Sequence, residues 1–222
     1  MPRVALVIPA YNNPAGLTRV LDSLPSSGLH RVYVVDDGSR EPLQVPAPAR
    51  LLRHPQNRGY GAAQKTGYAA SLANGADRVV LLHGDAQYPT GPTLALAEAL
   101  DAADCALGSR FLDDGGAVIP VWRRLGNRAL TAAANLRFGR AHTELHTGAR
   151  AFRAEALARL PLEDYSDDFV FDQQVLVGLF SRGMKVVERP VTARYEPDVQ
   201  SISPARAVRY GLGCLWTIAR PR

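Results

Sequence analysis

The sequence predicts a single α/β domain in which helices flank a mostly parallel central sheet. Short apolar and β-branched segments alternate with segments of helical periodicity, the pattern of βαβ units. The 222 residues suit one domain, and no linker, internal repeat or low-complexity tract divides them. Polar clusters directly follow several apolar segments, where open parallel sheets bind their ligands.

The first half of the chain shows the alternation most clearly. The expected strands cover residues 3–9, 31–35, 50–53, 77–82 and 105–108, and the expected helices cover residues 14–24, 61–74 and 90–103. Asn13 and Pro14 are a favourable N-cap and first helical residue, and Pro25 stops that helix. Thr90 is the expected cap of the helix over 90–103.

The second half is less regular. Helical periodicity covers 121–138 and 172–182, the latter ended by Gly183, and a basic helix is expected over 203–219. Residues 146–153 look extended. Residues 184–191 form an expected strand, and its proline near the end suits a sheet edge.

Composition excludes several classes of protein. With 46% hydrophobic and 21% charged residues, the chain is neither disordered nor collagen-like. A net charge of +5 suits nucleic acid, an anionic membrane surface or phosphorylated substrates. Because the positive charge is scattered and has no interleaved aromatic platform, nucleic-acid binding is not expected.

The cysteines and the lengths of the apolar runs indicate in which cellular compartment the protein is expected. Cys105 and Cys214 lie far apart in the sequence, which argues for a reducing environment without a disulfide framework. The first apolar run, about six residues, is too short for a signal peptide. No stretch approaches the ~18 apolar residues of a spanning helix. We therefore expect a cytoplasmic protein, soluble or attached to a membrane surface.

Asp85 and Gln87 are the expected metal ligands. Both follow an expected buried strand and place two oxygen ligands on one turn. A hard cation such as Mg²⁺ or Mn²⁺ accepts few protein oxygens together with substrate phosphates, and would neutralise charge on a diphosphate leaving group. The alternative is a polar turn with a capping aspartate.

Two further clusters have paired interpretations. Asp36 and Asp37 end an expected strand and could accept hydrogen bonds from a base or ribose, or could form a simple Asp-Gly turn. Residues 57–61 could place backbone N–H groups near a phosphate, or their glycines could allow close helix–sheet packing. Lys65, one turn further on, could face the nucleotide.

The motifs together resemble a known family. The segments that carry the resemblance, in order, are VIPAYNN, VVDDGS, NRGYGAAQKTGY, VVLLHGDAQYP, GSRF, HTGARAFR and KVVERPVTARY. They resemble family 2 glycosyltransferases of the GT-A fold, especially the branch of dolichyl-phosphate mannose synthase and polyprenyl-phosphate glycosyltransferases. The resemblance covers nearly the whole chain.

The resemblance implies a Rossmann-like GT-A domain that transfers a sugar with inversion from a GDP- or UDP-sugar, assisted by Mg²⁺ or Mn²⁺. Residues 1–110 would form the nucleotide-sugar half, and residues 111–222 the acceptor half with possible membrane-surface helices. By match to the family, the donor-binding residues would be Pro9, Ala10, Tyr11, Asn12, Asp36, Asp37, Lys65, His83, Gly84, Asp85 and Arg194.

His83 departs from the family pattern. It stands where relatives carry the first aspartate of the Asp-x-Asp motif, whereas Asp85 matches the second and Gln87 the glutamine that often follows. A neutral histidine changes the charge beside a diphosphate, so metal choice or nucleotide preference could change. Alternatively, His83 merely caps its strand.

The acceptor side offers two chemistries. A phosphate acceptor is largely ionised at neutral pH, because its second pKa is near ~6, and needs cations rather than a base. Arg123, Arg124 and Arg128 lie together on an expected helix and could bind it, or could form a solvated face.

A hydroxyl acceptor instead needs a positioned base. Asp167, Asp168 and Asp172 cluster in the second half, and each could be that base or a helix cap. Asp172, with Asp85, Arg124 and Arg128, is therefore a candidate catalytic residue. The basic helix at 205–220, which contains Trp216, could lie on anionic lipid or pack on the core.

Three functions remain open from the sequence. The first is sugar transfer to a polyprenyl phosphate at a membrane face. The second is a soluble glycosyltransferase acting on a hydroxyl of a glycan or small molecule. The third, suggested by His83, is a nucleotide-sugar-binding protein without activity.

Overall fold

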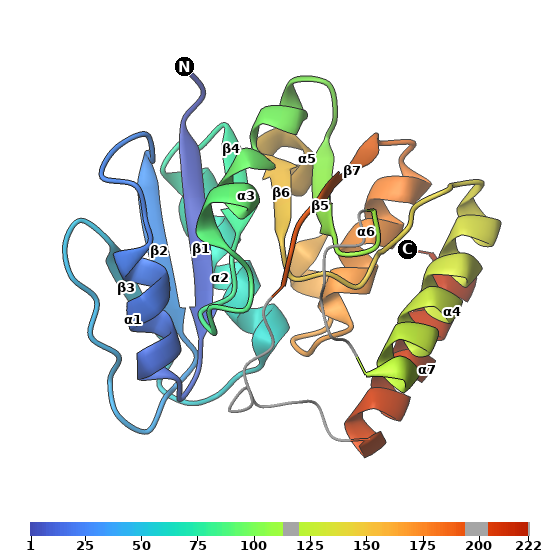
Figure 1. Ribbon diagram of the computed structural model, residues 1–222, viewed down its shortest axis with the longest axis horizontal. Coiled ribbons are helices and arrows are strands. Elements are labelled where there is room, and N and C mark those ends of the chain that lie inside the picture. Colours follow the sequence, from blue (N-terminus) through green and yellow to red (C-terminus); the bar gives the residue numbers. More distant parts are fainter. Residues whose placement is uncertain (113–119, 194–203, 222) are drawn as a thin grey trace.

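The computed structural model describes residues 1–112, 120–193 and 204–221. Within them, one seven-stranded sheet has the order β3-β2-β1-β4-β6-β5-β7 (Figure 1). The strands are β1 Val4–Ala10, β2 Arg31–Asp36, β3 Arg50–Arg53, β4 Arg78–Leu81, β5 Cys105–Ser109, β6 Arg150–Arg153 and β7 Val186–Pro190. The predicted α/β class and mostly parallel sheet are confirmed.

Strand β6 is the one antiparallel member among the described strands. It pairs antiparallel with both β4 and β5, whereas β1, β2, β3 and β4 pair parallel, as do β5 and β7. Of the segment expected to be extended over 146–153, only β6, Arg150–Arg153, is a strand. Since the other strands share one direction, their carboxyl ends open on one edge of the sheet, the lower edge in Figure 1.

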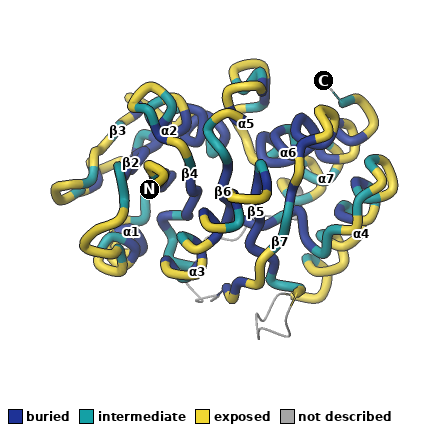
Figure 2. Tube along the Cα trace, turned by 90° about the horizontal axis from the view of Figure 1, so that it is seen from above, coloured by how far each residue is buried: buried dark blue, intermediate teal, exposed yellow. Residues whose placement is uncertain are grey.

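Helices cover both faces of the sheet. They are α1 Pro14–Asp22, α2 Tyr60–Ala73, α3 Thr90–Ala95, α4 Val121–Phe138, α5 Ala154–Ala158, α6 Phe171–Ser181 and α7 Pro204–Ala219, with short 3-10 helices η1 Glu98–Asp101 and η2 Leu162–Asp164. Figure 2 shows α1 and α3 on one face and α2, α5 and α6 on the other.

Alternating residues of β1 supply the two cores between these layers. Leu6 and Ile8 join the core under α1, whereas Ala5 and Val7 join the core under α2 and α6. Helices α4 and α7 contact each other beyond the β7 end of the sheet (Figures 1 and 2).

Two predictions about helix ends have different outcomes. Asn13 caps α1 as expected, since its Oδ1 accepts a hydrogen bond from Gly16 N at 2.9 Å. The expected single helix over 90–103 was wrong: α3 ends at Ala95, and η1 follows it. Thr90 does not cap this helix, because its buried hydroxyl bonds the hydroxyl of Ser23, the residue after α1, at 2.5 Å, and Pro89 stands at the cap position.

The edge position of β7 is confirmed. β7 ends at Pro190 and pairs with β5 as the last strand of the sheet order. Proline donates no ladder hydrogen bond, so an edge strand accommodates it at little cost. Along the described part of the chain, no helix combines the length and apolar character needed to cross a bilayer.

Candidate active site

The loops after β1, β2 and β4 meet at the lower edge of the sheet. Asp37 N donates to Ala10 O at 3.0 Å, and Gly84 N donates to Pro9 O at 3.2 Å. Asn12 N donates to the Ser39 hydroxyl at 2.9 Å. The structure thus brings together the polar clusters that the sequence placed at strand ends, with Tyr11 exposed beside them.

Asp36 is fully buried beneath this edge. One carboxylate oxygen accepts from Ser39 N at 2.9 Å, and the other pairs with the Arg53 guanidinium at 2.7 Å. Both carboxylate oxygens of Asp36 are therefore bonded to other residues of the protein, and Asp36 stabilises the turn after β2.

Asp37 is also engaged within the protein. Its carboxylate accepts from His54 Nδ1 at 2.7 Å and from the backbone N–H groups of Arg58 and Gly59, each at 2.9 Å. Gly59 has φ +111°, a backbone conformation that favours glycine. Asp37 thereby fixes the loop that leads into α2, and its contact with a base or ribose stays a prediction.

The first turn of α2 packs closely against the segment before α6. Gly61 N and Ala62 N donate to the carbonyl of Asp167 at 2.7 and 3.1 Å. A Cβ at Gly61 would lie 2.5 Å from Ser166 O, which leaves no space for a side chain. This supports the close-packing interpretation of the glycines.

Lys65 is directed toward the same segment. Its buried ammonium donates to the carbonyls of Glu163 and Tyr165 and pairs with Asp167 at 3.0 Å. It also lines a hollow of about 280 Å³ beside α5 and η2. A nucleotide contact by Lys65 stays a prediction, and its observed partners are all protein groups.

Asp85 and Gln87 lie on a tight turn after β4. Asp85 Oδ1 accepts from Gln87 N at 3.0 Å, and Ala86 between them has φ +60°. Both side chains are half-buried. Among the described residues, no group donates a hydrogen bond to Asp85 Oδ2, so an oxygen that can bind a ligand remains at the edge of the sheet.

A polar network beside this turn joins α2, the turn after β4 and α6. Tyr60 Oη lies 2.5 Å from His83 Nε2 and 3.4 Å from Asp172 Oδ2. Asp172 Oδ1 accepts from Gln64 at 2.8 Å, and its Oδ2 lies 3.3 Å from the fully buried Arg150 guanidinium. Burial, and then the charge of Asp172, raises the pKa of Tyr60 well above its ordinary value, so Tyr60 keeps its proton.

Sequence reasoning missed most of this network. Tyr60 and Gln64 lie one turn apart on α2, whereas Arg150 lies on β6, and no sequence pattern connects that helix with that strand. Asp172 is not the cap of α6, because Val170 stands at that position. Its carboxylate is paired with Arg150, and its role as a base stays a prediction. Arg150, the first arginine of the segment HTGARAFR, was the available signal. A fully buried arginine needs a partner of opposite charge, so its position predicted a nearby carboxylate.

The family can now be assigned from a comparison. The model of "Glycosyl transferase family 2" matches residues 5–160, which include every strand-end loop described above. The chain belongs to glycosyl transferase family 2.

Relatives with named activities agree with this assignment. The glycosyltransferase is 27% identical to an undecaprenyl-phosphate mannosyltransferase of Micrococcus luteus, over 99% of this chain and 98% of the relative. It is 30% identical to a polyprenol monophosphomannose synthase of Mycolicibacterium smegmatis, over 86% and 77%. The predicted resemblance to the polyprenyl-phosphate branch is confirmed, and so is the prediction of an enzyme.

A solved structure shares the fold. Glucosyl-3-phosphoglycerate synthase from Mycobacterium tuberculosis, crystallised with Mn²⁺, UDP-glucose and phosphoglyceric acid, superposes with a TM-score of 0.70 at 19% identity. The alignment covers 100% of this chain and 81% of that one. The likeness confirms the predicted GT-A fold.

The donor set of the glycosyltransferase fits a hard divalent ion. Asp85 offers a carboxylate oxygen and Gln87 an amide oxygen, the ligand types that Mg²⁺ and Mn²⁺ accept. In the described ranges, three or more His, Cys, Asp or Glu side chains do not gather into a metal cluster. The donor diphosphate and water would supply further ligands to the ion.

The arginines of the acceptor side lie at the start of α4. Arg124 and Arg128 are exposed, and the Arg128 guanidinium lies 5.6 Å from the centre of the Phe111 ring. Arg123 is half-buried, and its Nε has no hydrogen-bond partner among the described residues. Arg194, predicted near the donor diphosphate, lies outside the described residues.

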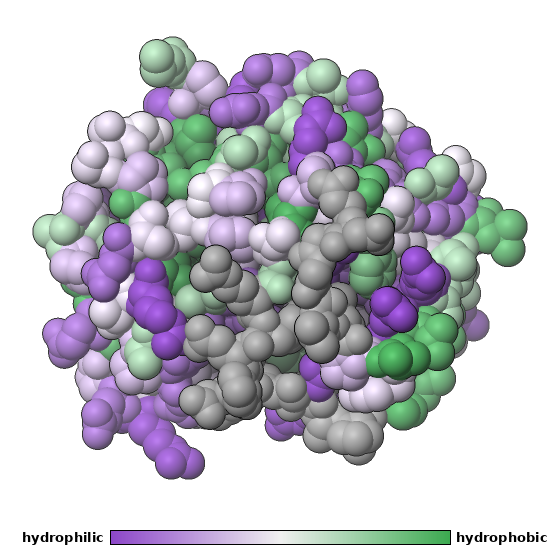
Figure 3. Space-filling model, in the orientation of Figure 1, coloured by the Kyte–Doolittle hydropathy of each residue, from purple (hydrophilic) through white to green (hydrophobic). Residues whose placement is uncertain are grey.

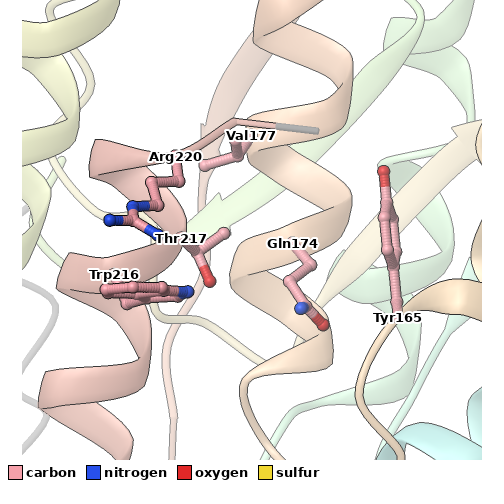
Figure 4. A pocket seen from close by; sticks show the side chains of 6 residues that line it. All are labelled: Tyr165, Gln174, Val177, Trp216, Thr217 and Arg220. Atoms are coloured by element: carbon pink, nitrogen blue, oxygen red, sulfur yellow. The ribbon is translucent and has the colours of Figure 1, made fainter.

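A separate hollow lies between α6 and α7 (Figure 4). Its volume is about 80 Å³, too small for a nucleotide-sugar, since ligand pockets usually exceed ~300 Å³. The Arg220 guanidinium lies 4.0 Å from the centre of the Trp216 ring, and Gln174 of α6 also lines the hollow. We assign it no role in the transfer reaction.

Proposed function

We propose that this enzyme transfers a sugar from a nucleotide-sugar to a polyprenyl phosphate at a membrane surface, with inversion at the anomeric carbon. The joint face of α4 and α7 carries the proposal. It exposes large apolar side chains beside arginines, at the end of the molecule where the strand-end loops also open (Figures 1 and 3).

The donor would bind over the loops after β1, β2 and β4. A divalent ion on Asp85 and Gln87 would neutralise the charge that grows on the leaving diphosphate. Asp37 holds the loop entering α2 and would thereby position the groups that meet the base or ribose. The solved relative of similar fold binds Mn²⁺ and UDP-glucose, which supports this donor class.

A phosphate acceptor fits the carboxylates of the acceptor side. An ionised phosphate oxygen can attack the anomeric carbon directly, with no base to remove a proton. Asp172 is paired with Arg150, and Asp167 with Lys65, while Asp168 Oδ1 accepts from Phe169 N at 2.8 Å. Because Asp172 and Asp167 are each paired with a cation, these contacts favour a phosphate over a hydroxyl acceptor.

Seven exposed side chains make up the apolar part of the surface, which we call the α4–α7 face: Val121, Trp122, Leu125, Val208, Leu212, Leu215 and Trp216. Leu125 and Leu212 are 62% and 64% exposed, and Figure 3 shows hydrophobic atoms gathered at the lower end of α4. An apolar face bordered by basic residues suits an anionic lipid surface. The relatives named for undecaprenyl-phosphate and polyprenol substrates support a lipid acceptor.

The test is incorporation of labelled sugar into polyprenyl phosphate, compared with free polyprenol, by wild type, Arg124→Ala and Arg128→Ala. We expect transfer to the phosphate alone, and a loss of at least about tenfold in each variant while nucleotide binding persists. Arg137→Ala is the matched control, because Arg137 lies at the opposite end of the same helix. Transfer to a soluble hydroxyl that depends on Asp167, Asp168 or Asp172 would replace this proposal with the hydroxyl reaction.

Membrane contact needs its own measurement. Basic residues near an anionic bilayer each contribute about 1 kcal/mol, so binding to phosphatidylserine vesicles should weaken as salt rises. Vesicle co-sedimentation at two salt concentrations measures this. Protein that stays in the supernatant at low salt would contradict the membrane part of the proposal. The predicted cytoplasmic location stays a prediction.

A further inference from the structure

The imidazole of His83 is held in one place by its neighbours. Tyr60 and Tyr88 meet it edge to face, with ring centres 5.2 and 5.9 Å away. Gly148 lies against it so closely that a Cβ there would be 2.4 Å from Cε1 of the ring. Tyr88 Oη accepts from Gly148 N at 3.1 Å, which fixes that backbone as well. The ring therefore has a defined orientation in the folded protein.

The hydrogen bonds of the network define which ring nitrogen carries the proton. An ionised carboxylate only accepts hydrogen bonds, and we assign the single O–H of Tyr60 to Asp172 Oδ2, 3.4 Å away. With this assignment the Tyr60 oxygen accepts from His83 Nε2, which lies 2.5 Å away. In a neutral imidazole the other nitrogen, Nδ1, consequently keeps a free lone pair.

This arrangement is typical of a metal-binding histidine. Such a histidine donates its second ring N–H to a carboxylate or another fixed acceptor, which sets the tautomer and makes the free nitrogen a better ligand. Tyr60 and Asp172 occupy that outer position here, and Arg150 and Gln64 hold Asp172 in turn. His83 also precedes Asp85 by two residues on the turn that offers the oxygen ligands.

We propose that His83 binds the active-site ion through Nδ1, so that this chain has a mixed nitrogen and oxygen site that prefers Mn²⁺ or Co²⁺ to Mg²⁺. The inference deepens the proposed function and rests on its ion site at Asp85 and Gln87. Imidazole suits transition ions, whereas Mg²⁺ prefers oxygen ligands in near-ideal octahedral geometry. Tyr60 acts as a positioning residue, because it reaches the ion only through His83.

Calorimetric titration of Mg²⁺, Mn²⁺ and Co²⁺ into the protein tests the proposal, with each ion added alone, with UDP and, in a parallel series, with GDP. We expect wild type to bind Co²⁺ and Mn²⁺ at least about tenfold more tightly than Mg²⁺. His83→Ala should weaken Co²⁺ binding about 10- to 100-fold and change Mg²⁺ binding by less than about threefold. His83→Asp, which supplies an oxygen ligand, should reverse the preference toward Mg²⁺.

Tyr60→Phe separates ligation from a merely structural role, because it removes one hydroxyl and keeps the aromatic ring. It should lower the ratio of Co²⁺ to Mg²⁺ affinity about tenfold, an effect that a general loss of stability would not produce. His30→Ala, at the other end of the sheet beside Asn74, is the matched control and should leave the ratio unchanged.

Pulsed electron paramagnetic resonance of bound Mn²⁺ gives a direct readout. We expect ¹⁴N modulation from a ligated imidazole in wild type and its loss in His83→Ala. Equal affinities for the three ions, or Mn²⁺ bound without ¹⁴N modulation, would overturn the role of His83. Ion binding that survives Asp85→Ala would instead contradict the ion site of the proposed function, so the two failures are distinguishable.

Discussion

The strand-end loops and the α4–α7 face differ in how far their side chains are buried and bonded. At the strand ends, Asp36 and Asp37 are buried and their carboxylates are bonded to the chain itself. On the α4–α7 face, Leu125, Leu212 and Trp216 are more than half exposed. A site whose polar groups are already fixed can bind a small polar ligand with little reorganisation. An exposed apolar face is stable in water only at a cost, which a lipid surface would remove.

The largest expected effect concerns the strand-end loops. Asp85→Ala should lower sugar transfer about 100- to 1,000-fold, because the ion that stabilises the leaving diphosphate loses its carboxylate. Turnover at saturating donor measures the loss, and thermal unfolding checks that the fold persists. Asp77→Ala, which removes an exposed ion pair with Arg3 at the other end of β4, should keep activity. Normal ion-dependent turnover by Asp85→Ala would remove the ion from this site.

A smaller effect is expected for the turn that Asp37 holds. Asp37→Ala leaves His54 and two backbone N–H groups without their acceptor, so the free energy of unfolding should fall by about 2–4 kcal/mol. Urea unfolding measures the loss, with Asp22→Ala on the exposed end of α1 as control. Donor affinity, measured where both proteins are folded, should also fall. Unchanged stability would show that the loop entering α2 does not depend on this carboxylate.

Substitutions on the α4–α7 face should instead weaken binding to membranes and leave the stability of the fold nearly unchanged. The double variant Leu125→Asp and Leu212→Asp should reduce partition onto anionic vesicles at least about tenfold, since two partly inserted leucines lose apolar burial. The free energy of unfolding should change by no more than about 0.5 kcal/mol per site. Leu136→Asp is the matched control: Leu136 is 89% exposed but lies near the end of α4 that is remote from the strand-end edge. Equal vesicle binding by all three proteins would argue against this face as the contact.

The smallest expected effect is a pH dependence of the free energy of unfolding, caused by His146, whose Nδ1 lies 2.6 Å from the Tyr210 hydroxyl of α7. Burial, followed by the charges of Arg150 and Arg110, lowers the pKa of His146 from its ordinary value of 6.5 to about 3. The folded protein therefore keeps His146 neutral, whereas the unfolded chain binds a proton below about pH 6.5. Stability is fully present above that pH and should fall by about 1.4 kcal/mol between pH 7.5 and 5.5.

His146→Gln tests this assignment. The free energy of unfolding should then fall less steeply below pH 6.5, by the contribution of about one bound proton. His30→Gln should leave this slope unchanged. Chemical denaturation at a series of pH values measures both. An unchanged slope in His146→Gln would place the acid sensitivity on other groups.

Part of the fold follows from local pattern. Apolar runs between Gly, Pro and Asp residues gave the strands near their observed bounds, and Asn13 caps α1 as predicted. The expected capping by Thr90 was wrong because the Thr90 hydroxyl bonds Ser23, a partner 67 residues away. The insertion of antiparallel β6 between β4 and β5 likewise depends on pairings between distant residues, which no local propensity encodes.

By itself, the sequence determined the fold class, the family and the turn with Asp85 and Gln87, because alternating apolar segments and short motifs are local properties. The tertiary structure alone decided which polar groups are already engaged. It paired Asp172 with Arg150, directed Lys65 to Asp167 and placed Tyr60 between His83 and Asp172. These contacts join residues that are 22 to 112 positions apart, and a buried charge is stable only where folding brings its partner.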